Sequence, residues 1–229
     1  MKMKSVKLVA VAIAATVLAI GTVANATTIN DPWAPYSADS SEQNLYQIYN
    51  SLYGTSYASG SALPQVSPDE IFNLLGGAGV VQAEARYAGL GQQFGFYQPT
   101  DGSGPITYTQ VFDVQNPNSG SPLAGFSQVI SPTGDFGFYD LAGGVYWHSQ
   151  AGLNPNQEDH MVTLATADPN VFLLAFEDLP FALSDQDYND LVVQLTVRPG
   201  NIVPEPTSMA LLGIGLAGMV VRKMRGKAK

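Results

Sequence analysis

Residues 171–176 read VFLLAF and residues 191–197 read LVVQLTV. Branched and aromatic apolar side chains of this kind favour β-strands. The stretch between them, residues 177–190, reads EDLPFALSDQDYND and carries five carboxylates and one asparagine. The pattern predicts two strands joined by an acidic loop, and this unit decides both the fold class and the candidate site.

The same strand-like pattern extends back to residue 80. Short stretches rich in Val, Thr, Tyr and Phe are separated by Gly, Pro, Asn and Asp, with no long helical segment between them. Such spacing is typical of antiparallel β-proteins, and no fixed repeat indicates a solenoid or a propeller. We therefore expect a mainly β protein in which residues 80–199 form an antiparallel β-sandwich with a jelly-roll-like topology. The candidate strands are residues 80–87, 94–98, 106–114, 124–130, 136–140, 145–148, 161–165, 171–176 and 191–197.

Residues 27–79 are expected to form a short helical N-terminal extension. A first helix is predicted to begin after Asp39 and to end at Gly54. A second, shorter helix is predicted over residues 67–77, which start with Ser-Pro and end with Gly-Gly. The apolar face of the first helix repeats at i, i+3, i+4 and i+7 and consists of Leu45, Ile48, Tyr49 and Leu52.

Residues 1–26 have the three parts of a secretory signal peptide. Three lysines precede an apolar stretch over residues 8–24, and Ala24-Asn25-Ala26 provides a small-x-small cleavage site. We expect cleavage after Ala26, so that the mature chain is exported.

The other end of the chain carries a second targeting signal. Residues 204–229 combine Pro204-Glu205-Pro206, an apolar stretch and a basic end. As a helix, the apolar residues 207–221 would extend roughly 22 Å, somewhat less than the ~30 Å hydrocarbon core of a membrane. The basic residues after it suit a cytoplasmic membrane face.

This arrangement resembles the PEP-CTERM sorting tail of proteins secreted by Gram-negative bacteria. The resemblance implies that an exosortase, a membrane protease, recognises Pro204-Glu205-Pro206 and removes the tail. We therefore expect residues 200–229 to be a sorting tail with a short membrane-spanning helix. The protein would be secreted or displayed at the cell surface after transient anchoring in the inner membrane.

Between the two targeting signals the composition is strongly acidic. Residues 27–203 contain 18 of the 19 acids but only two of the ten basic residues, Arg86 and Arg198, which gives a formal charge of −16. Such a surface repels nucleic acid and attracts divalent cations, of which calcium prefers carboxylate and carbonyl oxygens. The chain has no cysteine, which excludes disulfides, thiol nucleophiles and thiolate metal sites.

The acidic loop is the candidate cation site. Asp185, Asp187 and Asn189 reproduce the 1, 3, 5 spacing of oxygen ligands in calcium loops, although the sixth position is Asp190 rather than the glycine of an EF-hand. The nearest cation in the sequence is Arg198, so the loop carboxylates would repel one another. The alternative is that they form Asx-turns. We predict a calcium site with the candidate ligands Glu177, Asp178, Asp185, Asp187, Asn189 and Asp190.

A second resemblance starts from the same loop. Residues 174–179 (LAFEDL) and 185–192 (DQDYNDLV) are similar to the signature of domain of unknown function 4114, and residues 91–97 (GQQFGFY) and 153–160 (LNPNQEDH) add weaker matches. This family occurs in secreted bacterial proteins, often beside a PEP-CTERM tail. The resemblance implies an extracellular β-domain and no settled activity.

Two further polar features have alternative interpretations. Residues 154–160 (NPNQEDH) have three interpretations: further oxygen ligands, a segment that places His160 as a hydrogen-bond donor behind the site, or a polar turn. We favour the turn. His148 and His160 are the only histidines, and neither lies in a zinc motif. We expect both to be packing or surface residues.

These observations support three functions to different degrees. We predict a non-catalytic secreted or surface protein associated with exopolysaccharide. The alternative is a carbohydrate-binding module that uses Trp33, Trp147 and the tyrosines, which an exposed coplanar row of rings would favour and burial would oppose. The second alternative is a glycoside hydrolase with paired carboxylates. No nucleophile elbow, phosphate loop or lysine in residues 27–203 supports an enzyme.

Overall fold

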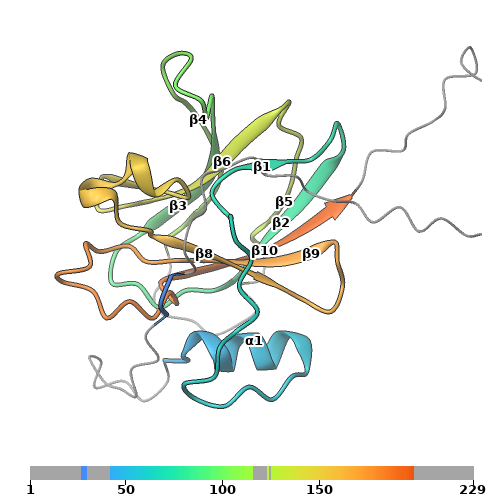
Figure 1. Ribbon diagram of the computed structural model, residues 1–229, viewed down its shortest axis with the longest axis vertical. Helices are drawn as coiled ribbons and strands as arrows, with labels where there is room; N and C mark the ends of the chain where they lie inside the picture. The colour runs from blue at the N-terminus through green and yellow to red at the C-terminus, as the bar shows by residue number, and fades with distance from the viewer. Residues whose placement is uncertain (1–26, 30–41, 116–122, 124, 199–229) are drawn as a thin grey trace, which may run out of the picture.

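The computed structural model describes residues 27–29, 42–115, 123 and 125–198, which form one α-helix and two five-stranded antiparallel sheets (Figure 1). The first sheet has the strand order β5-β2-β10-β9-β8, with bounds Ser127–Ile130, Ala78–Ala85, Leu191–Arg198, Val171–Phe176 and Met161–Ala165. The second sheet has the order β1-β6-β3-β4 with β7 paired to β6, and its bounds are Phe72–Asn73, Asp135–Ala142, Gln92–Gln98, Thr107–Val114 and Val145–His148.

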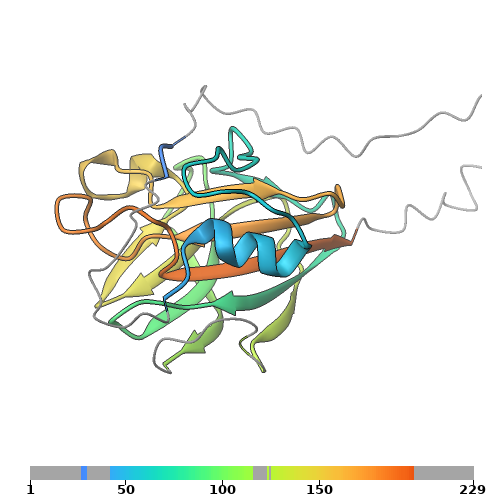
Figure 2. The same ribbon diagram turned by 90° about the horizontal axis from the view of Figure 1, so that it is seen from below.

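The first sheet is apolar on both faces, because it contributes to two cores. Alternate side chains of a strand point to opposite faces. On one face they pack against the second sheet in a shared core that includes Phe94, Phe112, Phe136, Phe138, Leu174, Phe176, Val193 and Leu195. On the other face, Leu173, Ala175 and Val192 pack against helix α1 (Leu45–Tyr53). Figures 1 and 2 show the resulting order of helix, first sheet and second sheet.

A β-bulge lets strand β2 serve both cores. Val193 pairs with Ala83 and Val192 pairs with Ala85, so Glu84 is the extra residue in the ladder. Before the bulge, Ala83 belongs to the shared core, and after it Ala85 belongs to the helix-side core. The shift turns the next residue, Arg86, toward the space between the two sheets.

The predicted fold class is confirmed in its main features. Each of the nine candidate stretches overlaps a strand, and three of them, residues 145–148, 161–165 and 171–176, have the observed bounds. The jelly-roll-like form of the sandwich and the division of the chain into domains at residues 80 and 199 stay predictions.

Helix α1 confirms the predicted apolar face, since Leu45, Ile48 and Tyr49 are buried. Gly54 ends the helix with a φ of 64°, in the left-handed region that favours glycine. The predicted start is wrong: the helix begins at Leu45, and the N-cap is Asn44, whose backbone N–H donates to Gln47 Oε1 at 3.0 Å. Asp39, the predicted cap, lies outside the described residues.

The second predicted helix, over residues 67–77, is also wrong. The segment contains the short strand β1, in which Phe72 pairs with Phe136 of β6. Asp69 accepts a hydrogen bond from the backbone of Thr163 in β8 at 2.8 Å, and Gln65 forms a bridge with Leu164. The segment therefore crosses from the first sheet to the second, and these long-range contacts override the local helical pattern.

Several predictions fall outside the described residues. They are the signal peptide with Ala24 and Ala26, the sorting residues Pro204, Glu205 and Pro206, the C-terminal sorting helix, and Trp33. Among the residues that the structure describes, no helix combines the length and the apolar character needed to cross a membrane.

Candidate functional site

The acidic loop joins two neighbouring strands at one end of the first sheet. Leu191 pairs with Phe176, so the residues next to them, Glu177 and Asp190, enter the loop side by side. The backbone N–H of Asp178 donates to Asp190 Oδ2 at 2.8 Å and closes the base of the loop. The strand pairing alone therefore brings both ends of the acidic stretch together.

The loop then folds back so that its carboxylates form two overlapping groups. One consists of Glu177, Asp185 and Asp187, and the other of Glu177, Asp178 and Asp190; within each, candidate ligand oxygens lie within 4.8 Å of one another. Glu177, Asp178 and Asp187 are buried, whereas Asp185 is exposed. These clusters of acidic residues can hold a metal ion.

Glu177 is the residue common to both groups, and it is 1% exposed. Its Oε2 atom is buried and has no hydrogen-bond partner. A buried carboxylate oxygen without a donor is costly, because burial removes its hydration and nothing replaces it. The residues present thus fit a cation, which would supply the missing positive charge.

The loop backbone adopts conformations that are uncommon for residues other than glycine. Gln186 and Tyr188 have φ values of 59° and 56°, in the left-handed region. Tyr188 is fully buried in the helix-side core, and its hydroxyl donates to the carbonyl of Asp159 at 2.7 Å. The packing of Tyr188 holds the backbone in this shape and keeps Asp185 and Asp187 near Glu177.

Asn189, a predicted ligand, makes contacts that position its neighbours. Its Nδ2 donates to Asp187 Oδ2 at 2.6 Å and to the carbonyl of Gln43 at 3.1 Å. Asn189 is 1% exposed, so these bonds are shielded from water. The contacts orient the Asp187 carboxylate and fasten the loop to the segment before α1.

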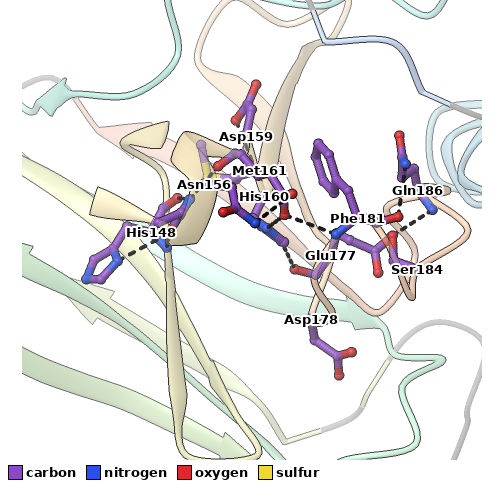
Figure 3. Close-up of polar contacts among 12 residues, drawn as sticks. His148, Asn156, Asp159, His160, Met161, Glu177, Asp178, Phe181, Ser184 and Gln186 are labelled. Atoms are coloured by element: carbon purple, nitrogen blue, oxygen red, sulfur yellow. Dashed lines mark hydrogen bonds and ion pairs between the residues drawn. The ribbon is translucent and has the colours of Figure 1, made fainter. Parts of the chain in front are cut away.

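A histidine and a glutamate support the loop from the other side (Figure 3). His160 Nδ1 lies 2.9 Å from the carbonyl oxygen of Glu177, and its Nε2 lies 3.3 Å from Glu158 Oε2. Glu158 Oε2 also accepts a hydrogen bond from the backbone of Phe181 at 3.0 Å. His160 is fully buried and stacks on Trp147, with ring centroids 4.1 Å apart. His160 is thus a buried packing residue, and its contact with the Glu177 carbonyl also fits the alternative of a hydrogen-bond donor behind the site; burial lowers its pKa.

The stretch 154–160 forms the predicted polar turn. Two short 3₁₀ helices, Ala151–Leu153 and Pro155–Gln157, flank Asn154. Asn154 is buried, and its Oδ1 accepts a hydrogen bond from the backbone of His148 at 2.7 Å. This turn carries Glu158 and His160 to the loop, while Asn154 itself bonds to the backbone of His148 and Glu158.

Polar residues also line the end of the shared core beside the loop. Gln92 precedes Phe94 by two residues, and Asp140 and Asp178 follow Phe138 and Phe176 by two, so the inward alternation of each strand continues with a polar side chain. Gln92 Nε2 donates to Asp140 Oδ2 at 3.0 Å and to Asp178 Oδ2 at 3.4 Å. We call this set the inner polar group: Arg86, Gln92, Asp140 and Asp178.

Arg86 is the positive charge of the inner polar group. It is 3% exposed and is anchored by a hydrogen bond from Nη2 to the carbonyl of Leu90. Burial lowers its pKa, while Asp178, Asp140 and Asp190 oppose that shift. The expectation that Arg198 would be the nearest cation is therefore wrong. Arg198 ends β10, roughly 23 Å along the strand from the loop.

Burial and mutual repulsion raise the pKa values of the loop carboxylates. The pKa of Glu177 rises to about 11, through burial first and then through Asp190, Asp187 and Asp185. The pKa of Asp187 rises to about 8 for similar reasons. The pKa of Asp178 rises only to about 7, since the charge of Arg86 opposes the effect of burial. Without a cation, the loop would therefore hold protons at neutral pH.

The aromatic side chains offer less support for a sugar platform. Trp147 is 2% exposed, so the prediction that it stacks on sugar rings is not supported by its position. On the outer face of the second sheet, Tyr108 and Tyr146 are half-buried and stack on each other with centroids 4.0 Å apart. Gly137 makes room for the ring of Tyr97, because a Cβ atom there would lie 2.2 Å from it. The rings thus pack mainly against one another and the sheet.

The structure adds residues that sequence reasoning missed. Arg86, Gln92 and Asp140 come from three separate segments, and their spacing along the chain gives no sign of contact, whereas Glu158 lies in the stretch 154–160 that the sequence already offered as a source of oxygen ligands. The available signal was a polar residue at an inward-facing position of a strand, as for Asp140 after Phe136 and Phe138. Such a residue is rarely buried without a partner.

Comparison with known protein families agrees with both resemblances. The family described as a domain of unknown function (DUF4114) matches residues 91–198, and the PEP-CTERM protein-sorting motif matches residues 203–225. The chain is thus a PEP-CTERM sorting-motif protein that carries a domain of unknown function 4114. No curated protein matches it. The sorting motif supports a secreted or cell-surface protein that is recognised by an exosortase.

Proposed function

We propose that this protein is a non-catalytic component of the extracellular matrix whose acidic loop binds calcium. After export, an exosortase would remove the tail, and the acidic domain would associate with exopolysaccharide. The observation that carries the calcium part is the buried, unpartnered Glu177 Oε2 beside the carboxylates of Asp185 and Asp187.

The chemistry of the donors favours calcium over other cations. Both acidic groups offer carboxylate oxygens alone, without the histidine or cysteine ligands that zinc prefers. Calcium accepts irregular shells of six to eight oxygens, whereas magnesium requires a near-ideal octahedron. Backbone carbonyls of the tightly folded loop and water would complete such a shell. Asp185 is exposed, so the ion would remain accessible to acidic groups of a polysaccharide.

The two alternatives have less support. A carbohydrate-binding role would use aromatic rings that lie flat on the surface, and Trp147, Tyr97 and Tyr139 are buried. A glycoside hydrolase would hold its paired carboxylates in a substrate cleft. Among the residues that the structure describes, no carboxylate lines the cavity of about 420 Å³ beside α1, and a smaller cavity of about 70 Å³ is lined by one, Asp69, so neither holds a pair.

Thermal unfolding of the full-length protein in detergent, with calcium, magnesium or a chelator, tests the proposal. At ten times Kd, one calcium site stabilises the folded state by about 1.4 kcal/mol. For a folded part of this size, each kcal/mol raises the midpoint by roughly 2–4 °C. We expect a rise with calcium that magnesium does not reproduce.

Two substitutions assign the effect to the loop. Asp187→Ala and Asp190→Ala each delete an anionic ligand and are expected to remove the calcium effect. Asp101→Ala, in an exposed turn, is the matched control and is expected to retain it. If Asp187→Ala and Asp190→Ala both retain the effect, calcium binds elsewhere and the proposal fails.

A further inference from the structure

We propose that the chain holds a second divalent cation between the two sheets, on Asp140, Asp178 and Gln92. This inference rests on the proposed calcium function, since a calcium ion would occupy each of the two positions. It adds a site that joins β3 and β6 of the second sheet to the end of β9 in the first sheet.

Two oxygen atoms of this position are buried without partners. Asp140 and Gln92 are both 0% exposed. Asp140 Oδ1 and Gln92 Oε1 have no hydrogen-bond partner. Both are acceptors without a hydrogen-bond donor, and the charge of Arg86 acts on Asp140 without a hydrogen bond to this oxygen, so a cation would provide the missing contact.

The distances among the oxygens suit a calcium shell. The terminal amide of Gln92 lies between two carboxylates, 3.0 Å from Asp140 Oδ2 and 3.4 Å from Asp178 Oδ2. A half-turn of the amide exchanges its nitrogen and its oxygen, which have nearly the same shape. Ligand oxygens 2.3–2.6 Å from a calcium ion and about 72–90° apart lie about 2.7–3.7 Å from one another. With its oxygen turned inward, Gln92 would therefore offer a third ligand oxygen at such a distance from each of the two carboxylates.

The charge of the whole cluster also calls for two ions. Six carboxylates surround the loop base: Asp140, Glu177, Asp178, Asp185, Asp187 and Asp190. Arg86 contributes one positive charge, and its guanidinium is tied to the carbonyl of Leu90. With all six carboxylates ionised, one divalent cation leaves the cluster at about −3 and two leave it at about −1, and unbalanced buried charge is strongly unfavourable.

Calcium stoichiometry tests the second position. Equilibrium dialysis of the full-length protein in detergent with radioactive calcium counts the ions bound by wild type and variants. We expect two ions in wild type and one in Asp140→Asn, which removes a charge without changing the shape. Asp135→Asn is the matched control, since Asp135 lies on the same strand but is exposed, and it is expected to retain two ions.

A second variant guards against a trivial loss of folding in Asp140→Asn. Gln92→Glu adds an anionic ligand and is expected to keep two ions and to tighten the weaker site several-fold. If Gln92 served only as a hydrogen-bond donor, the affinity of Gln92→Glu for calcium would not increase. The variant would then be destabilised equally in calcium and in chelator.

The outcomes separate this inference from the proposed function. One ion in wild type, lost in Asp187→Ala and unaffected by Asp140→Asn, overturns the second position and leaves the loop site intact. No bound ion in wild type overturns both. Two ions, of which Asp140→Asn loses one and Asp187→Ala the other, support both.

Discussion

Glu177 and Asp178 are neighbours in sequence, yet they lie in different electrostatic surroundings. Asp178 belongs to the inner polar group, whereas Glu177 belongs to an outer acidic group, defined as Glu177, Asp185 and Asp187. The strongest charges acting on Glu177 are those of other carboxylates, whereas Asp178 also lies near Arg86. Burial raises both pKa values, and with these different charges the pKa of Glu177 rises to about 11 and that of Asp178 to about 7.

The difference follows from strand geometry. Leu174 and Phe176 are the inward-facing residues at the end of β9, and Asp178 continues their alternation, so it reaches the space between the sheets. Glu177 takes the opposite direction and meets Asp185 and Asp187. One step along a strand thus decides whether a carboxylate near Asp190 also has an arginine beside it.

The largest expected effect comes from removing the cation of the inner polar group. Arg86→Met leaves Asp140 and Asp178 buried without their arginine, and breaking such a buried arrangement costs about 3–5 kcal/mol. Urea unfolding in chelator measures the loss. Arg198→Met, at an exposed position, is the control and is expected to change stability by no more than about 0.5 kcal/mol. Equal effects of the two substitutions would show that Arg86 does not balance the inner carboxylates.

The next effect is a pH dependence of the calcium-free protein. The pKa values of Asp178 and Asp187 rise to about 7 and about 8, so from about pH 4 to pH 7 the folded state binds more protons than the unfolded state. The stability that these protons contribute is fully present below about pH 4. As the pH rises from there through 7 to 8 it is lost, at about 1.4 kcal/mol per pH unit for each extra proton that the folded state binds. Urea midpoints at pH 5, 6 and 7 in chelator measure this slope.

Calcium provides the contrast for that experiment. An ion bound to the ionised carboxylates replaces the protons, so the slope should flatten in calcium. A slope that is the same in calcium and in chelator would mean that these carboxylates do not bind the ion.

A smaller effect, which calcium should reduce, is expected for Glu177→Gln. In chelator the variant removes the most strongly perturbed carboxyl group and should be more stable than wild type by about 2 kcal/mol at pH 7. In calcium it lacks a ligand charge and should gain less from the ion than wild type does. The stability advantage of the variant over wild type should therefore be smaller in calcium than in chelator, and a variant less stable than wild type in both would contradict the outer site.

The smallest effect on stability is expected for Asp185→Asn. Asp185 is exposed, so the calcium-free variant should lie within about 0.5 kcal/mol of wild type. Its carboxylate nevertheless belongs to the outer acidic group, and its loss should weaken calcium binding on the order of tenfold. Calorimetric titration measures the affinity, and an unchanged Kd would remove Asp185 from the ligand set.

Local patterns predicted the strands well because each strand carries its own apolar alternation or β-branched run. The same reasoning failed for residues 67–77, where Phe72 and Asp69 are positioned by β6 and β8 rather than by their neighbours in sequence. The acidic loop could be recognised from its charge density alone. Its connection to Asp140 and Gln92 could not, because those residues meet it only after the two sheets have packed.

The burial of Arg86 also has a consequence for proteolysis. Arg86 and Arg198 are the only basic residues between positions 27 and 203, and Arg198 is followed by Pro199, a bond that trypsin does not cut. The remaining bond, after Arg86, lies in the folded interior, where Arg86 is 3% exposed. A trypsin-like protease therefore finds its one cleavable bond in this region only when the protein opens, and the rate of cutting reports how often that happens.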